Sequence, residues 1–207
     1  MDNYYKQYCE SHDSALNKLE ITTLVGEVVT HNRGFNTLCD LSAKLAESGC
    51  QKYFIGNGAS AAFANHMALD WSKNGGIPSH AFANSALVTA MGNDLGFDEV
   101  FSSPLSCYAK KGDLLITISS SGNSVNIIKS IEVARKIGMG VVTFSGLKPE
   151  NESRKMGDFN FYLPAKTYGI VECAHQLLLH AWLDKYMGII EWEREGYQNM
   201  HKDAFSL

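Results

Sequence analysis

A run of small polar residues separates an apolar segment from a helical pattern in the middle of this chain. Residues 114–118 (Leu-Leu-Ile-Thr-Ile) have the length and composition of a buried strand. Across residues 125–137, apolar side chains recur at the spacing of one helix face. The loop between them is Ser119-Ser-Ser-Gly-Asn-Ser124. Backbone N–H groups at a helix N-terminus, with serine hydroxyls beside them, can hold a phosphate monoester. The same residues would also serve as a plain helix cap.

A second loop of similar character is Gly56-Asn-Gly-Ala-Ser60, which follows the apolar segment 53–55. It lacks the third glycine of a dinucleotide-binding fingerprint, and the serine loop lacks the Gly-Lys-Ser/Thr of a Walker motif. Neither loop contains a basic residue. This pattern favours a compact bound phosphate over a nucleoside triphosphate, which needs a lysine and a metal ion.

Two groups of titratable side chains follow these loops on predicted helices. His66 and Asp70 are four residues apart and so share a helix face, which makes half of a metal site. Glu172, His175 and His180 lie on a long closing helix. About 12 Å of helix rise separates Glu172 from His180, so one ion is shared only if both side chains lean toward it. The alternative interpretation is a hydrogen-bonded histidine and a solvated carboxylate.

Strand and helix patterns alternate through most of the chain. Such alternation predicts βαβ units in a doubly wound αβα sandwich with a mainly parallel, five-stranded sheet. Both loops then fall at the carboxyl ends of strands, where ligands bind in such sheets. Helices over residues 5–19 and 22–46 are predicted to precede the first strand, where they form a subunit interface or cover one sheet face. The predicted strands are residues 53–55, 79–83, 114–118, 140–144 and 159–163.

Length and composition predict one domain. We divide the 207 residues into N-terminal helices (1–50), an αβα core (51–188) and a C-terminal tail (189–207). The net charge of −4 does not favour nucleic acid binding, and no apolar run reaches the roughly 20 residues of a membrane span. The N-terminus lacks the apolar core of a signal peptide. Five scattered cysteines without a CxxC pair favour a reduced, cytoplasmic compartment.

Three motifs at matching spacing resemble the SIS (sugar isomerase) domain, and most closely its phosphoheptose isomerase branch. They are residues 56–61, 92–96 and 119–124, and the similarity extends from about residue 20 to residue 188. The resemblance implies a flavodoxin-like fold and a homotetramer with the N-terminal helices at its centre and sites shared between subunits. It also implies that a sugar phosphate is bound by Asn57, Gly58, Ser60, Asp94, Ser119, Ser120, Ser121 and Ser124.

The resemblance also suggests a reaction and a metal. The family interconverts sedoheptulose 7-phosphate and a heptose 7-phosphate through an enediol, which requires a base at carbon and an acid at oxygen. Some members bind zinc through His, Glu, Gln and His. His66 and His180 match the two histidines, Asp70 takes the glutamate position and Glu172 the glutamine position. We therefore expect one Zn²⁺ at these four residues, with His180 as acid and base. Asp70 is the favoured base for the carbon-bound proton and Glu172 the second candidate.

Some positions depart from the family pattern. Besides Asp70 and Glu172, Asn74 stands where an arginine is frequent and Gly169 where an aspartate is common. The predicted function is a ketose–aldose isomerase that makes D-glycero-D-manno-heptose 7-phosphate for surface glycans such as lipopolysaccharide or capsule. The alternatives are an isomerase of a different sugar phosphate and a non-catalytic phosphosugar-binding scaffold. The two histidines with two carboxylates favour an enzyme.

Overall fold

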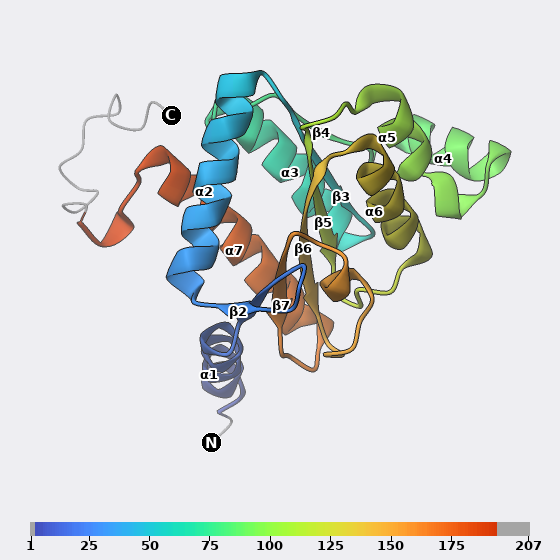
Figure 1. Ribbon diagram of the computed structural model, residues 1–207. Helices are drawn as coiled ribbons and strands as arrows, with labels where there is room; N and C mark the ends of the chain where they lie inside the picture. Colours follow the sequence, from blue (N-terminus) through green and yellow to red (C-terminus); the bar gives the residue numbers. More distant parts are fainter. Residues whose placement is uncertain (1–2, 194–207) are drawn as a thin grey trace.

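A mainly parallel sheet covered by helices on both faces forms the centre of the computed structural model, which describes residues 3–193 (Figure 1). The strands are β1 (Glu20–Thr23), β2 (Val28–Val29), β3 (Lys52–Gly56), β4 (Ser79–Ala81), β5 (Leu114–Ser119), β6 (Gly140–Gly146) and β7 (Phe159–Leu163). The helices are α1 (Tyr4–Asn17), α2 (His31–Ser48), α3 (Ala59–Lys73), α4 (Ser85–Asp94), α5 (Ser102–Tyr108), α6 (Val125–Ile137) and α7 (Tyr168–Met187). Short 3-10 turns lie at Phe97–Glu99, Ser153–Lys155 and Glu191–Glu193.

All five predicted strands are present, and they pair in parallel in the order β7-β6-β5-β3-β4. The chain enters this sheet at β3, moves outward to β4 and then returns past β3 to β5. Consequently, the connections after β3 and β5 leave toward opposite faces, and the gap between them is the switch point where such sheets bind ligands. The predicted doubly wound, flavodoxin-like topology is confirmed.

The prediction of five strands, with a helix over 22–46, is wrong at its N-terminal end. β1 and β2 form an antiparallel hairpin, and β1 pairs antiparallel with β7, so the sheet has seven strands within residues 3–193. The β-branched residues Ile21, Thr22 and Thr23 favour a strand, and Gly26 supplies the positive φ of the turn. The helix begins only at His31, where the Thr30 hydroxyl accepts a hydrogen bond from the Arg33 N–H.

The helices divide into two layers, each with its own apolar core. Figure 1 shows α2, α3 and α7 on one face of the sheet and α4, α5 and α6 on the other. On the first face, Trp71 of α3 packs against Trp182 of α7, with their ring centroids 5.0 Å apart. This contact holds the two helices side by side, so polar residues on their facing sides come together.

No helix within residues 3–193 combines the length and the apolar character that crossing a bilayer requires. Of the C-terminal tail predicted over 189–207, residues 194–207 lie outside the described part of the chain.

Candidate active site

A cavity of about 290 Å³ lies at the carboxyl ends of β3 and β5, at the switch point of the sheet. All of the predicted substrate-binding residues except Asp94 line it. Asp94 lies at the exposed end of α4, where its carboxylate accepts a hydrogen bond from Asn93 Nδ2 at 2.8 Å. The lining comprises Asn57, Gly58, Ala59, Ser60, Ile118, Ser119, Ser120, Ser121, Ser124, Tyr168 and Glu172.

Two glycines allow the loops to approach each other closely. A Cβ at Gly56 would lie 2.6 Å from Ser60 Cβ and 2.8 Å from the Ile118 carbonyl oxygen. Gly122 has a φ of +65°, and a Cβ there would overlap the side chain of Asn151. Larger residues at either position would therefore displace a loop.

The serine loop keeps hydrogen-bond donors available for an anion. Ser119 Oγ accepts a hydrogen bond from the Gly122 N–H at 3.2 Å, and Ser121 Oγ accepts one from the Asn123 N–H at 3.3 Å. Each hydroxyl oxygen thus serves as an acceptor and retains its own proton for donation. Ser124 is the N-cap of α6, but its hydroxyl caps no N–H within the described chain. Ser120 Oγ is likewise buried without a partner among residues 3–193.

The two loops are tied together by a pair of asparagines. Asn57 Nδ2 donates to Asn126 Oδ1, and Asn126 Nδ2 donates to Asn57 Oδ1, both at 2.9 Å. Asn126 is buried, and it fixes the spacing of the cavity walls. Sequence reasoning missed Asn126 and also Tyr168. For Asn126 a signal was available, because its amide side chain lies in the first turn of the helix whose N-terminus was predicted to bind phosphate.

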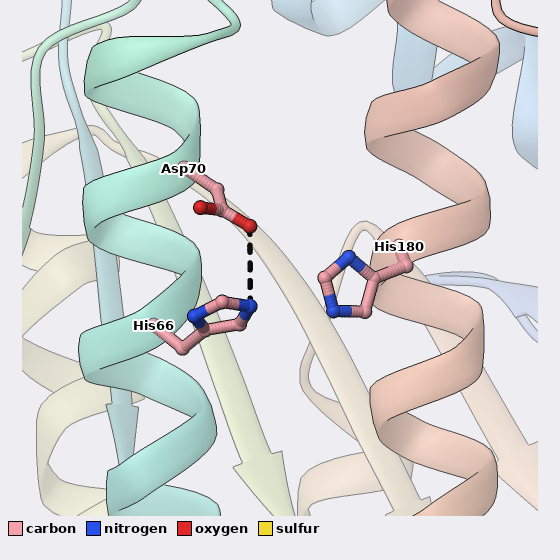
Figure 2. A group of neighbouring side chains, drawn as sticks. All are labelled: His66, Asp70 and His180. Carbon is pink, nitrogen blue, oxygen red and sulfur yellow. Dashed lines mark ion pairs between the residues drawn. The ribbon is translucent and has the colours of Figure 1, made fainter. Parts of the chain in front are cut away.

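A second polar group lies between α3 and α7. Figure 2 shows His66 and Asp70 on α3 facing His180 on α7. His66 Nε2 lies 3.2 Å from Asp70 Oδ2, and the two histidine rings meet edge to face with centroids 5.2 Å apart. Donor atoms of these three residues lie within 4.8 Å of one another. We call this group the His–Asp cluster. Two imidazoles and one carboxylate are a donor set that suits Zn²⁺.

Glu172 is separate from the His–Asp cluster among the described residues, because it lines the serine cavity instead. The structure therefore brings three of the four predicted ligands together. Glu172 and His180 are separated along α7 by a helix rise of about 12 Å, and a metal site that includes Glu172 stays a prediction.

Gln176, which sequence reasoning missed, lies beside His180. Gln176 Nε2 is 2.7 Å from His180 Nε2. Gln176 Oε1 is buried and has no hydrogen-bond partner within the described part of the chain. The four-residue spacing to His180 was the signal that could have found it.

His175 serves the fold. Its Nε2–H donates to the Ser145 carbonyl oxygen at 3.1 Å, which fastens α7 to the end of β6. Burial lowers the pKa of His175 to about 4, and the hydrogen bond to Ser145 opposes this shift only in part. The ring is therefore neutral at physiological pH.

Comparison with known proteins identifies the family of this chain. A model of the SIS domain family matches residues 19–146. The chain belongs to the SIS domain family. The matched range contains all three motifs, whereas Glu172, Gln176 and His180 lie beyond it.

Phosphoheptose isomerases are among the relatives of this SIS domain. The chain is 30% identical to the phosphoheptose isomerase of Aliarcobacter butzleri over 164 residues, which cover 76% of this chain and 86% of that protein. It is 40% identical to that of Rhodospirillum rubrum over 105 residues, which span 48% of this chain and 56% of that relative. The structure of phosphoheptose isomerase from Neisseria gonorrhoeae superposes with a TM-score of 0.75 at 26% identity, covering 88% of this chain and 95% of that one. The predicted resemblance to the phosphoheptose isomerase branch is confirmed.

Proposed function

We propose that the protein is a ketose–aldose isomerase that converts sedoheptulose 7-phosphate into D-glycero-D-manno-heptose 7-phosphate. The observation that carries the proposal is the alignment of the serine-lined cavity and the His–Asp cluster along the same helix pair, α3 and α7. About 12 Å of α7 separates the level of Glu172 from that of His180. An extended seven-carbon sugar phosphate has a similar length, so its phosphate and its carbonyl end can occupy the two regions together.

The serine cavity is proposed to hold the phosphate. None of the described residues that line it is a lysine or an arginine, so the donors are hydroxyls and the N–H groups at the start of α6. The carboxylate of Glu172 would repel a phosphate at close range. We therefore assign Glu172 to the hydroxyls in the middle of the sugar, from which it accepts hydrogen bonds.

The chemistry is assigned to the cluster end. His180 moves a proton between the two oxygens of the enediol, because an imidazole both donates and accepts near neutral pH. Asp70 takes the carbon-bound proton, since it lies beside His180 in the His–Asp cluster whereas Glu172 lines the serine cavity. A Zn²⁺ held by His66, Asp70 and His180 would supply Lewis acidity toward the carbonyl oxygen.

The proposed assembly is a homotetramer. Leu69 on α3 is 59% exposed and Leu177 on α7 is 45% exposed, and both lie on the helices that form the His–Asp cluster. Figure 1 also shows α1 projecting from the sheet, and its Tyr5 is 80% exposed. Apolar side chains at these positions support burial against further copies of the chain. Light scattering should give four times the 22.8 kDa chain mass, and a monomer at micromolar concentration would refute the proposal.

We place this activity in the cytoplasm, where it would supply heptose for surface glycans. All five cysteines in the described chain are free, and Cys9, Cys107 and Cys173 are exposed. Exposed thiols of this kind persist in a reducing compartment.

The test is direct conversion. Purified protein is incubated with sedoheptulose 7-phosphate, with and without added Zn²⁺, and the aldose phosphate is followed by NMR. We expect conversion that Zn²⁺ accelerates. Conversion only of a shorter ketose phosphate would identify a different substrate. Binding of sugar phosphates without conversion of any of them would identify a phosphosugar-binding protein instead.

A further inference from the structure

The serine loop presents one side to the cavity and the other side to the connection between β6 and β7. Four of its serines line the cavity, whereas Gly122 and Asn123 do not. Since none of the described lining residues is a lysine or an arginine, a bound anion depends on N–H and O–H donors alone. A carbonyl oxygen turned into such a cavity would repel the anion. The direction of the oxygens of the loop therefore decides how well it can hold a phosphate.

The first part of the β6–β7 connection holds two oxygens of the loop by hydrogen bonds. The Gly122 carbonyl oxygen accepts a hydrogen bond from the Ser153 N–H at 2.9 Å. Asn123 Oδ1 accepts one from the Glu152 N–H, also at 2.9 Å. We call residues 147–153 the backing segment, because they contact the loop through the two residues that do not line the cavity.

The free N–H groups of the loop belong to residues on its cavity side. The N–H groups of Ser121 and Ser124 donate to no oxygen among residues 3–193. The Ser120 carbonyl oxygen is occupied, because it accepts a hydrogen bond from the Gly146 N–H at 3.1 Å, at the end of β6. The loop thus keeps donors for an anion while its acceptors are bound by the neighbouring strand and the backing segment.

Asn151 fixes the shape of the backing segment. This side chain is fully buried. Its Oδ1 accepts hydrogen bonds from Ser153 Oγ at 3.2 Å and from the Arg154 N–H at 3.1 Å. Its Nδ2 donates to the Lys148 carbonyl oxygen at 2.8 Å. The same side chain lies against Gly122, where a Cβ would overlap it. Asn151 therefore ties the backing segment together directly beneath the loop.

The backing segment also begins with a strained residue. Leu147 has a φ of +56°, the only positive φ of a residue other than glycine in the described chain. Its carbonyl oxygen accepts a hydrogen bond from the Tyr162 hydroxyl at 3.1 Å. Such a conformation persists only where the surrounding contacts enforce it. The segment is thus held in one definite conformation against the loop.

We propose that Asn151 is a positioning residue for phosphate binding. It holds the backing segment against Gly122, and the N–H groups of that segment then keep the oxygens of Gly122 and Asn123 out of the cavity. The inference rests on the proposed function, because it takes the serine cavity as the phosphate site. It assigns a role in substrate binding to a segment that does not line the cavity.

Phosphate affinity tests this role without relying on turnover. The unfolding temperature of each protein is measured as inorganic phosphate is added, and its rise gives the affinity. Steady-state kinetics with sedoheptulose 7-phosphate gives kcat and KM separately. Asn151→Ala should weaken phosphate binding and raise KM by about 10-fold, with kcat unchanged. Asn123→Ala changes an exposed side chain and should weaken phosphate binding by about 2- to 3-fold, so the test holds even if Asn151→Ala does not fold.

A matched control exists at the other end of the same connection. Asn160 is also a fully buried asparagine, and its side chain binds Thr22, Thr143 and Gly157, none of which belongs to the serine loop. Asn160→Ala should lower the unfolding temperature, as Asn151→Ala does. It should leave the phosphate affinity and KM unchanged.

Two results would overturn the inference. Wild-type phosphate affinity in folded Asn151→Ala and Asn123→Ala would show that the backing segment does not position the loop. Equal weakening by Asn151→Ala and Asn160→Ala would reveal a general effect of lost stability. If the wild type binds phosphate but converts no sugar phosphate, the isomerase proposal fails, and the affinities of the variants still decide the role of Asn151. Absence of phosphate binding by the wild type would overturn both.

Discussion

The serine cavity and the His–Asp cluster are built from different parts of the polypeptide. The cavity draws its donors from the backbone and hydroxyls of two short loops, each of which is continuous in the sequence. The cluster draws its donors from side chains on two helices that are distant in the sequence and pack together through core contacts such as Trp71–Trp182. The difference implies that a phosphate in the cavity would be held by many weak donors, whereas the chemistry proposed for the cluster would depend on single groups.

The largest expected effect comes from removing His180. His180→Ala should lower kcat by about 10²- to 10⁴-fold, because a positioned acid and base is lost, while KM stays nearly constant. Steady-state kinetics with sedoheptulose 7-phosphate measures both. His80→Ala, at the opposite edge of the sheet, is the control. A normal kcat in His180→Ala would show that the cluster is not catalytic.

A smaller effect should distinguish the two carboxylates. Asp70→Asn should reduce kcat by about 10²-fold as the loss of a base, whereas Glu172→Gln should raise KM more than it reduces kcat. Comparing kcat and KM for the two variants makes the assignment. If Glu172→Gln has the greater loss in kcat, then Glu172 is the base and the division between the two regions is misplaced.

The cavity is tested by removing two of its hydroxyls together. The double variant Ser121→Ala and Ser124→Ala should raise KM by about 10- to 100-fold with little change in kcat, since each lost hydrogen bond contributes about 0.5–1.5 kcal/mol net of competition with water. Ser48→Ala is a matched control, because that hydroxyl binds only backbone carbonyls of α2. An unchanged KM in the double variant would contradict phosphate binding at this loop.

The smallest effect on function is expected at a third polar region between the same helices. Lys52 is fully buried, donates to Ser42 Oγ at 2.9 Å, and lies over the ring of Trp71 with the rings of Trp182 and Tyr186 nearby. Burial lowers the pKa of Lys52 well below its usual 10.5, and the nearby Cys39 opposes this shift weakly.

This buried amine gives a pH dependence of known sign. Between the lowered pKa of the folded state and about 10.5, the unfolded chain binds a proton that the folded chain does not, so stability rises with pH. Lys52→Met should therefore unfold at a higher temperature than the wild type at pH 7, and the difference should shrink toward pH 10. Thermal unfolding of both proteins between pH 7 and pH 10 tests this prediction. A difference in unfolding temperature that stays constant over this range would contradict it. Unchanged kcat and KM in Lys52→Met would show that the effects at the His–Asp cluster are local.

The sequence predicted the cavity more completely than the cluster for a physical reason. The residues of the serine loop are neighbours in the chain, so their strand-to-helix position was enough to bring Ser119, Ser121 and Ser124 together. The metal ligands come from two helices, so the complete set depends on the relative positions of α3 and α7, which no local pattern contains. Gln176 was overlooked because it is uncharged, although its four-residue spacing from His180 on the same helix brings the two side chains together.

The fold was predicted with one error of the same origin. Most of the parallel strands are apolar runs that can be recognised without context, and all five, including the short β4, were predicted. β1 and β2 are short, and their place in the sheet comes from antiparallel pairing with β7, which is distant in the sequence. The β-branched residues 21–23 were the local sign of this strand.

The central claim is that one molecule occupies the serine cavity and the His–Asp cluster together. The most direct test compares aldose formation from sedoheptulose 7-phosphate with that from sedoheptulose, each in the presence and absence of inorganic phosphate. The account predicts that kcat/KM is at least about 10²-fold higher for the phosphorylated sugar, and that inorganic phosphate inhibits its conversion competitively. Equal conversion of the two sugars, or no conversion of either, would contradict it.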